Sequence, residues 1–318
     1  MNGMIVILKK ELSDHFTSYR FLILFALIAM VSMITAYMAG LNMAKNLESM
    51  AKPKFIFMLM FTSSGAGFSL VDFVSIFGPL IGIILGFDTI NRERNEGTLS
   101  KLLSQPIYRD AVVNGKFLAG FVLIAIMMTA ILLVVSALGL IILGIVPGVE
   151  EMWRIFIYLL ISIFYIGFWL GLAILFSILF RSVATSALAS IAAWVFLSFF
   201  LSLGANAVAN ALTPDAGESN PESYLRRANI EKAISLASPL NLYSDATITV
   251  IDPMKKTTRS VVQVGMMEQI SMARFSGPLP LSQSILIVMP YIISMVAITI
   301  LCFGISYTVF MRQEIRSV

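Results

Sequence analysis

The sequence is poor in charged residues, in cysteine and in histidine. Charged residues make up 13% of its 318 residues and hydrophobic residues 58%, whereas soluble domains carry about 25% charged residues. The chain therefore lacks the polar surface that a water-facing globule needs. Cys302 is the one cysteine, which excludes an intrachain disulfide. His15 is the one histidine, which excludes an HExxH metal site and places it, by expectation, in water or among lipid headgroups.

The motifs of several enzyme classes are also missing. The chain has no GxSxG, and Gly115-Lys116 lacks the upstream glycine and the following Ser or Thr of a phosphate-binding loop. Glu150, Glu151 and Arg154 lie near the EExxxR pattern of some intramembrane proteases, but the arginine comes one position early and no apolar run contains a histidine. We interpret this stretch as a charged turn and keep an intramembrane protease as a remote alternative. The prediction is a chain that is no enzyme, with no catalytic residue, metal ligand or cofactor of its own.

Long uncharged runs make up most of the chain. A helix needs about 20 apolar residues to cross the roughly 30 Å of membrane hydrocarbon. Six such runs predict an all-α polytopic membrane protein in which residues 1–318 form a single transmembrane domain. The predicted spans are Phe21–Gly40, Val71–Phe87, Phe117–Val146, Ile155–Phe180, Val183–Ala205 and Ser284–Phe310.

The placement of Lys and Arg predicts the orientation in the membrane. With the N-terminus inside, eleven of them lie in cytoplasmic parts and four in the two short outer loops. Cytoplasmic loops are enriched in Lys and Arg, so both termini are predicted to be cytoplasmic. The same helix-end residues account for most of the net charge of +4, which needs no nucleic-acid partner. Residues 206–283 are then an extracytoplasmic segment, in which Ile248, Val250 and Ile251 fit either a short strand or a helix.

The residues before the first span have a helical pattern. Ile5, Leu8, Leu12, Phe16 and Tyr19 recur at intervals of three and four, which puts them on one face of a helix. An amphipathic helix next to a span most simply lies flat on the membrane surface. We therefore predict an interfacial helix over residues 4–19 that contacts membrane lipid.

The predicted spans carry almost no ionisable side chains. Asp72, at the outer end of the second span, is the sole acidic candidate, and we expect it to cap that helix rather than to carry ions. Buried charges in a membrane are costly and usually mark ion pathways. A transporter with its own proton or sodium relay is therefore not expected, so the energy for any transport has to enter elsewhere.

Small residues indicate where helices approach each other closely. Gly78, Gly82 and Gly86 recur every four residues on the second span. Such a stripe lets two helix backbones come together in lipid. It predicts either helix packing within the chain or an interface between two copies.

The segment Asp88–Lys116 is a charged island between two apolar walls. It holds nine of the forty Asp, Glu, Lys and Arg residues of the chain. Leu99, Leu102 and Leu103 share one helical side, and Pro106 ends the helix because the residue before a proline is disfavoured in the α region. A short amphipathic helix of this kind fits docking into a groove of another protein, although an ordinary solvated connection is an alternative.

The island also carries a family resemblance. Glu93 to Leu99 read ERNEGTL, Leu102 to Pro106 read LLSQP, and Arg109 and the Gly115-Lys116 pair follow. This pattern resembles the signature of ABC-2-type transporter permeases. The leader Lys9–Phe16 resembles the connecting helix of that family, and Ser238–Thr247 resembles its pre-helix segment. The likeness is closest to the permeases of nitrous-oxide-reductase copper-site maturation.

The resemblance implies the membrane-spanning half of an ATP-driven ABC transporter, most simply an exporter in a prokaryotic plasma membrane. It would pair with a second permease copy and with two copies of a separate ATPase subunit that hold ATP and Mg²⁺. An extracytoplasmic binding or accessory protein is a further possible partner. An ATPase-coupled membrane scaffold that transmits force to such a partner is the alternative.

In that family the loop between the second and third spans is the coupling loop, here residues 88–116, seated in a cleft of the ATPase. Glu/Arg pairs would set its register and leucines would supply buried area. The implied ATPase contacts are Glu93, Arg94, Glu96, Gly97, Thr98, Leu99, Leu102 and Leu103, with Arg181 in the turn between spans four and five as a further contact.

Overall fold

The computed structural model describes residues 3–47, 55–62, 69–105, 107–213, 236–253 and 279–313, with residues 226–227, 229–231 and 233–234. Every described element is helical, and six helices are long and apolar enough to cross a membrane. This confirms the predicted all-α membrane protein. The spanning elements are α2 (Tyr19–Leu47), α4 (Leu70–Gly86), α7 (Arg109–Leu143), α8 (Val149–Leu179), α9 (Val183–Val195) with η1 (Phe196–Phe200), and α14 (Leu281–Arg312). The shorter helices are α1 (Gly3–Phe16), α3 (Ile56–Thr62), α5 (Asn91–Asn95), α6 (Thr98–Leu103), α10 (Leu201–Leu212) and α12 (Pro239–Ile251).

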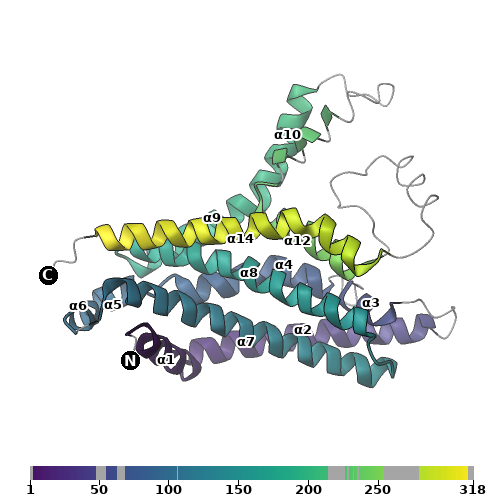
Figure 1. Ribbon diagram of the computed structural model, residues 1–318, viewed down its shortest axis with the longest axis horizontal. Coiled ribbons are helices and arrows are strands. Elements are labelled where there is room, and N and C mark those ends of the chain that lie inside the picture. Colours follow the sequence, from purple (N-terminus) through teal and green to yellow (C-terminus); the bar gives the residue numbers. More distant parts are fainter. Residues whose placement is uncertain are drawn as a thin grey trace.

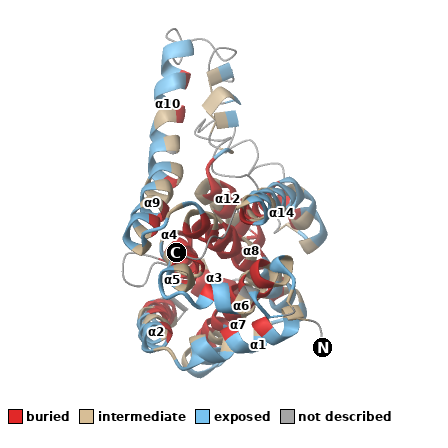
Figure 2. Ribbon diagram, turned by 90° about the vertical axis from the view of Figure 1, so that its left-hand side faces the viewer, coloured by how far each residue is buried: buried red, intermediate tan, exposed pale blue. Residues whose placement is uncertain are grey.

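Helix α8 is the centre of the bundle. It packs against α4, α7, α12 and α14, and the buried residues concentrate around it (Figures 1 and 2). Tyr158, Tyr165 and Trp169 of α8 are fully buried. Helices α9, η1 and α10 follow one another without a break, and α10 projects away from the other helices (Figure 1). The bundle thus has one well-packed core around α8 and a helical arm with an exposed surface.

One end of the bundle holds α1, α5 and α6, and the N- and C-termini lie at that end (Figure 1). We call it the cytoplasmic end, following the orientation that the Lys and Arg residues predict. At the opposite end, Asp72 caps α4 as expected. Its N–H donates to Ser69 Oγ (3.1 Å), while the Ser69 hydroxyl donates to Asp72 Oδ2 (2.8 Å). This reciprocal capping fixes the start of α4 one residue before the predicted span.

The glycine stripe of α4 lies against α8 of the same chain. A Cβ on Gly82 would stand 2.5 Å from the Ile166 carbonyl oxygen, and one on Gly86 would stand 2.8 Å from the Ala173 Cβ. A Cβ on Gly78 would meet the Ile166 side chain at 3.1 Å. The stripe therefore serves packing within the chain, and α8 already occupies the face that a second copy would need.

Gly82→Ala is expected to lower the free energy of unfolding by about 1–3 kcal/mol. The new methyl would meet backbone atoms of α8 that cannot rotate away, so α4 and α8 would have to separate. Gly304→Ala on α14 is the matched control, because a Cβ there meets no described atom within 4 Å and alanine favours the helix by up to about 1 kcal/mol. Thermal unfolding in detergent measures both variants. Equal melting temperatures would contradict the close α4–α8 contact.

The predicted extracytoplasmic segment, residues 206–283, contains a helix that enters the bundle. Helix α12 packs against α4, α8 and α14, and its apolar residues are buried. The Tyr243 ring stacks on Tyr165 at 4.3 Å between centroids, and its hydroxyl is 2.9 Å from Ser162 Oγ. Tyr165 lies about 24 Å along α8 from its first residue, at 1.5 Å per residue. The described helix of this segment therefore lies within the bundle, and Ile248, Val250 and Ile251 belong to a helix rather than to a strand.

Arg154 joins α12 to α8 and α14 at the outer end. Its guanidinium is fully buried and donates to the carbonyl oxygens of Val250 (2.8 Å) and Leu279 (2.7 Å) and to Glu150 Oε1 (2.8 Å). Glu151 accepts from the Gly148 N–H at 2.8 Å. The stretch that we interpreted as a charged turn is therefore the capped first turn of α8. Its arginine is engaged in packing, which argues against the protease alternative.

Candidate functional site

The charged island forms two short helices instead of one. Helix α5 ends at Asn95, and α6 begins at Thr98 after Gly97, whose φ of 69° is a left-handed conformation that favours glycine. The Thr98 hydroxyl donates to the Glu93 carbonyl oxygen across this turn (3.2 Å). Helix α6 ends at Leu103, and Pro106, expected to end it, lies outside the described residues. The island therefore presents a helical hairpin whose tip is Glu96 to Thr98.

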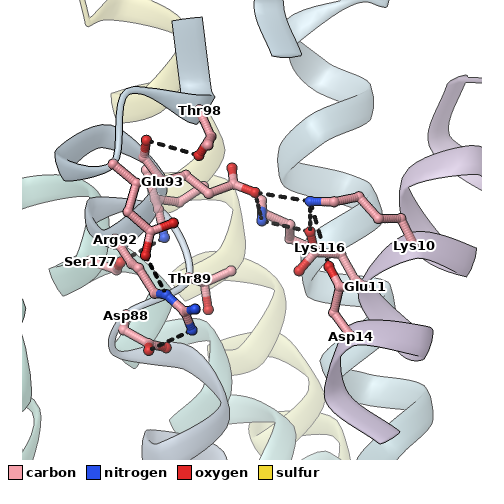
Figure 3. Close-up of polar contacts among 12 residues, drawn as sticks. Lys10, Glu11, Asp14, Asp88, Thr89, Arg92, Glu93, Thr98, Lys116 and Ser177 are labelled. Carbon is pink, nitrogen blue, oxygen red and sulfur yellow. Dashed lines mark hydrogen bonds and ion pairs between the residues drawn. The ribbon is translucent and has the colours of Figure 1, made fainter. Parts of the chain in front are cut away.

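A buried ion-pair cluster holds the base of this hairpin (Figure 3). Lys116 on α7 has a side chain that is 2% exposed, and its Nζ lies 2.8 Å from Glu11 Oε1 and 3.0 Å from Glu93 Oε1. Lys10 Nζ lies 3.3 Å from the same Glu93 oxygen and 3.4 Å from Glu11 Oε1. Two carboxylates and two ammonium groups thus join α1, α5 and α7. We call these four residues the Lys116 cluster.

Titration of the cluster follows from its geometry. Burial alone would raise the pKa of the Glu11 carboxyl, but the Lys116 ammonium and then Lys10 outweigh it and lower this pKa below its usual value. Burial opposes the charged form of Lys10, yet Glu11 and Glu93 raise the pKa of its ammonium. Burial also lowers the pKa of His15, which is half-buried near the end of α1. The Glu11–Lys10 part of the cluster is therefore ionised at neutral pH.

The island is also bonded to the ends of α8 and α9. The backbone N–H groups of Ile90 and Asn91 donate to Ser177 Oγ at 2.9 and 3.1 Å. The Asn95 amide donates to the Arg181 carbonyl oxygen at 3.2 Å. The structure thus brings Arg181, predicted as a separate contact, next to α5, with its side chain exposed.

The last described residue, Gln313, makes a third attachment. Arg94 Nη2 donates to Gln313 Oε1 at 2.7 Å, and Arg109 Nη1 donates to its carbonyl oxygen at 3.3 Å. Gln313 in turn donates through Nε2 to the Ile178 carbonyl oxygen at 3.0 Å. The residue after α14 therefore ties together α5, α7 and α8.

The predicted contact residues divide between the surface and the interior. Glu96, Gly97, Thr98 and Arg181 are exposed, and Arg94 and Leu102 are half-buried. Leu99, expected to supply buried area to a partner, is instead 1% exposed within the chain. Glu93 likewise turns inward to the Lys116 cluster. Leu103 belongs to α6, but its side chain lies outside the described residues.

Helix α1 turns an unexpected face to the bundle. Ile7 and Glu11 are buried against α7, where a Cβ on Gly115 would stand 2.8 Å from Ile7 Cγ2. Ile5, Phe16 and Tyr19, which belong to the predicted apolar face, are exposed. Leu8 and Leu12 of the same face are half-buried, and Leu12 packs against the core. Part of the apolar face is therefore exposed, and its contact with lipid stays a prediction. A second, narrower face holds α1 to the protein.

Three residues of the site were not predicted from the sequence. Glu11 and Ser177 sit inside ordinary-looking helical stretches, and Gln313 follows the last span without any motif. The position of Lys116, directly before the apolar run that begins at Phe117, indicated only weakly that it belongs to the site. A lysine at that boundary is usually solvated, so the sequence did not indicate its burial.

Comparison with protein families identifies the chain. Residues 5–315 match the family described as ABC-2 family transporter protein. A comparison with curated proteins found no match. Members of the matched family are membrane subunits that work with a separate ABC ATPase subunit. Because the match covers nearly the whole chain and six helices can span a membrane, the chain belongs to the ABC-2 transporter family as a membrane permease subunit of an ABC transporter.

Proposed function

We propose that this permease receives the energy of ATP hydrolysis through the hairpin of α5 and α6. The tip of the hairpin, with Arg181 beside it, binds a cleft of the ABC ATPase subunit. One observation carries the proposal. The tip is exposed, while the base is bonded to α1, α7 and α8 and to the residues that begin α9 and follow α14. An exposed tip on a firmly attached base is what a mechanical coupling needs.

The attachments give the coupling a physical route. Breaking a buried ion pair by removing one partner costs about 3–5 kcal/mol, so the Glu93–Lys116 link resists separation when the tip is displaced. A displacement of α5 is then passed to α7 through Lys116, to α8 through Ser177 and to the end of α14 through Gln313. Closure of the ATPase dimer would move these helices together and alternate access to the transport path.

The rest of the assembly follows the family pattern. Two copies of this chain work with two ATPase copies in a prokaryotic plasma membrane, and export is the proposed direction. Because α8 covers the α4 glycine stripe, the second copy has to use another surface. The apolar spans are compatible with drugs, lipids, peptides or a sulfur species as cargo. The neighbouring genes, above all one for an ATPase and one for a copper-handling protein, would narrow this choice.

Glu96→Lys is expected to lower recovery of the permease–ATPase complex and transport-coupled ATP hydrolysis at least tenfold, because it reverses an exposed charge at the tip. The measurement is co-purification with the ATPase subunit, followed by ATP hydrolysis and vesicle transport. Asp14→Lys is the matched control. Each acid is exposed and pairs with a base four residues earlier on its own helix, Arg92 for Glu96 and Lys10 for Asp14. If Glu96→Lys keeps wild-type recovery and hydrolysis, the assignment of the tip is wrong.

The same assay distinguishes a transporter from a scaffold that only transmits force. A scaffold that only transmits force would show ATP hydrolysis that depends on Glu96 but no movement of solute into vesicles. A transporter shows both, and Glu96→Lys abolishes both together.

A further inference from the structure

A cleft of about 850 Å³ lies between α1, the start of α2, the end of α4 and the α5–α6 hairpin. Its volume falls in the range of pockets that hold a small molecule, about 300–1,000 Å³. The Lys116 cluster lines one side of it. The opposite side holds Arg20, Asp88 and Arg92, which the coupling route does not use.

The position of the cleft places it at the membrane surface. Phe21 belongs to the first turn of α2, and Ile84 and Leu85 belong to the last turn of α4, so the apolar lining comes from the cytoplasmic ends of two spans. Tyr19, on the rim, is 82% exposed. Aromatic residues of this kind gather where hydrocarbon gives way to headgroups. The cleft therefore joins the acyl-chain level to the headgroup level of the cytoplasmic leaflet.

Basic groups converge at the rim of the cleft. Arg20 Nη1 and Arg92 Nη1 lie 2.9 and 4.0 Å from the same Asp88 Oδ2. The two arginine side chains are 67% and 57% exposed, whereas that of Asp88 is 15% exposed. The carboxylate thus sits behind the guanidinium groups and holds them in place.

Lys101 adds an uncommitted positive charge to the lining. Among the described residues it forms no ion pair, although the cleft also contains Asp14 and Glu96. Those two exposed acids already pair with Lys10 and Arg92. Two guanidinium groups with free N–H donors and one free ammonium are groups that bind phosphate oxygens.

We propose that this cleft binds the phosphate of a membrane phospholipid headgroup. Arg20, Arg92 and Lys101 contact the phosphate oxygens, and the first carbons of the acyl chains lie along Phe21, Ile84 and Leu85. Free phosphate offers the same charge, but only a lipid also matches the apolar lining. The bound lipid fills the space between α1 and the hairpin and so supports the hairpin from the membrane side. Glu96 and Thr98 of the hairpin tip also line the cleft, but the test below uses the permease alone, so its outcome does not depend on ATPase binding.

Lipid titration of the purified full-length chain in detergent, read by native mass spectrometry, tests the proposal with phosphatidylglycerol as the probe. Lys101→Ala is expected to weaken the tightest bound lipid about fivefold, the effect of one basic residue at a membrane surface. This variant breaks no ion pair of the described chain, so its fold is retained. Arg20→Ala is expected to weaken binding at least as much. Lys9→Ala is the matched control, because Lys9 is an exposed lysine of α1 that does not line the cleft.

Unchanged affinity in Lys101→Ala and Arg20→Ala would overturn the proposal. Equal weakening in Lys9→Ala would also overturn it, since it would indicate unspecific attraction to the basic surface. A competition arm separates the two sources of phosphate. If the lipid stays bound in 10 mM inorganic phosphate, the lipid assignment is supported. If inorganic phosphate displaces the lipid, the cleft is a site for soluble anions and the lipid assignment is wrong.

Discussion

Lys116→Met is expected to lower the free energy of unfolding by about 3–5 kcal/mol. The substitution keeps the length of the side chain but leaves Glu11 and Glu93 buried next to each other without the ammonium that lies 2.8 and 3.0 Å from them. In a thermal melt this corresponds to a fall in Tm on the order of 10 °C. Coupling of ATP hydrolysis to transport should weaken at temperatures where the variant is still folded, because the direct ion pair between α5 and α7 is gone and only the attachment through Gln313 remains.

Lys10→Met is the matched control for this experiment. Lys10 contacts the same two carboxylates, but its side chain is 47% exposed, and exposed ion pairs contribute about 0–1 kcal/mol. Its Tm should therefore stay close to that of the wild type. If both variants melt at the wild-type temperature, the Lys116 cluster does not hold the hairpin in the way described.

The pH dependence gives an independent check on the cluster. In the wild type the lowered pKa of Glu11 means that its contribution to stability is present above the usual carboxyl pKa and is lost as the pH falls through the lowered value. In Lys116→Met the largest cause of that lowering is gone while Glu11 stays buried, so protonation of Glu11 relieves the variant. The difference in Tm between wild type and variant should accordingly shrink as the pH falls from 7 towards 4.

Arg154→Met should have the second largest effect on stability. It leaves the buried carbonyl oxygen of Val250 and the half-buried one of Leu279 without the donors that now lie 2.8 and 2.7 Å away. An unsatisfied buried acceptor costs about 1–3 kcal/mol and a half-buried one less, so the total loss is about 2–5 kcal/mol. The loss should appear at α12, which Arg154 joins to α8 and α14. Hydrogen exchange of residues 239–251 measures this directly and should speed up in the variant.

Two further substitutions define the role of Arg154. Arg154→Lys should recover less than half of the lost stability, since one ammonium cannot reproduce a guanidinium fork directed at several acceptors. Glu150→Gln should cost less than about 1 kcal/mol, because the Glu150 side chain is 41% exposed. Wild-type exchange rates at α12 in Arg154→Met would show that other contacts hold this helix.

The spans were predictable because lipid imposes a simple requirement. A stretch of about 20 apolar residues is sufficient evidence for a crossing, and each of the six predicted spans overlaps one of the six spanning helices. The differences lie at the ends. Helix α7 begins at Arg109 rather than Phe117, because Lys116 and the residues before it are covered by α1 and α5 and need not lie in lipid.

Shorter buried helices were not predictable in the same way. Helix α12 has 13 residues and includes Asp245, Thr247 and Thr249, so no hydropathy window distinguishes it from an external loop. Its threonine hydroxyls donate to carbonyl oxygens four residues earlier, at 2.7 and 3.1 Å, which satisfies them inside the bundle. Helix α3 has seven residues and is buried through Phe57 and Phe61. It is too short for a crossing, so the search for spans did not predict it.

The position of the candidate site stays a prediction, based on the charge of the island and on the family resemblance. Contacts between distant segments decide which side chains turn inward. Glu11 and Lys116 are 105 positions apart in the sequence, and Arg94 and Gln313 are 219 positions apart. Helical periodicity assigned Leu99 to an outward leucine face. Since α6 is a separate short helix after Gly97, Leu99 points into the chain instead, while its neighbours Thr98 and Ser100 stay exposed.

Photo-cross-linking from the hairpin tip measures whether the tip enters the ATPase cleft. Thr98→Cys is made in a Cys302→Ala background, labelled with benzophenone maleimide and assembled with the ATPase subunit. The label then lies on the surface that is proposed to enter the ATPase cleft. Thr17→Cys is the control, because Thr17 is also exposed at the cytoplasmic end but lies at the end of α1. We expect an adduct of permease and ATPase from position 98 and little or none from position 17. An assembled complex that gives no adduct from position 98, or equal adducts from both positions, would contradict the proposed contact between the tip and the ATPase.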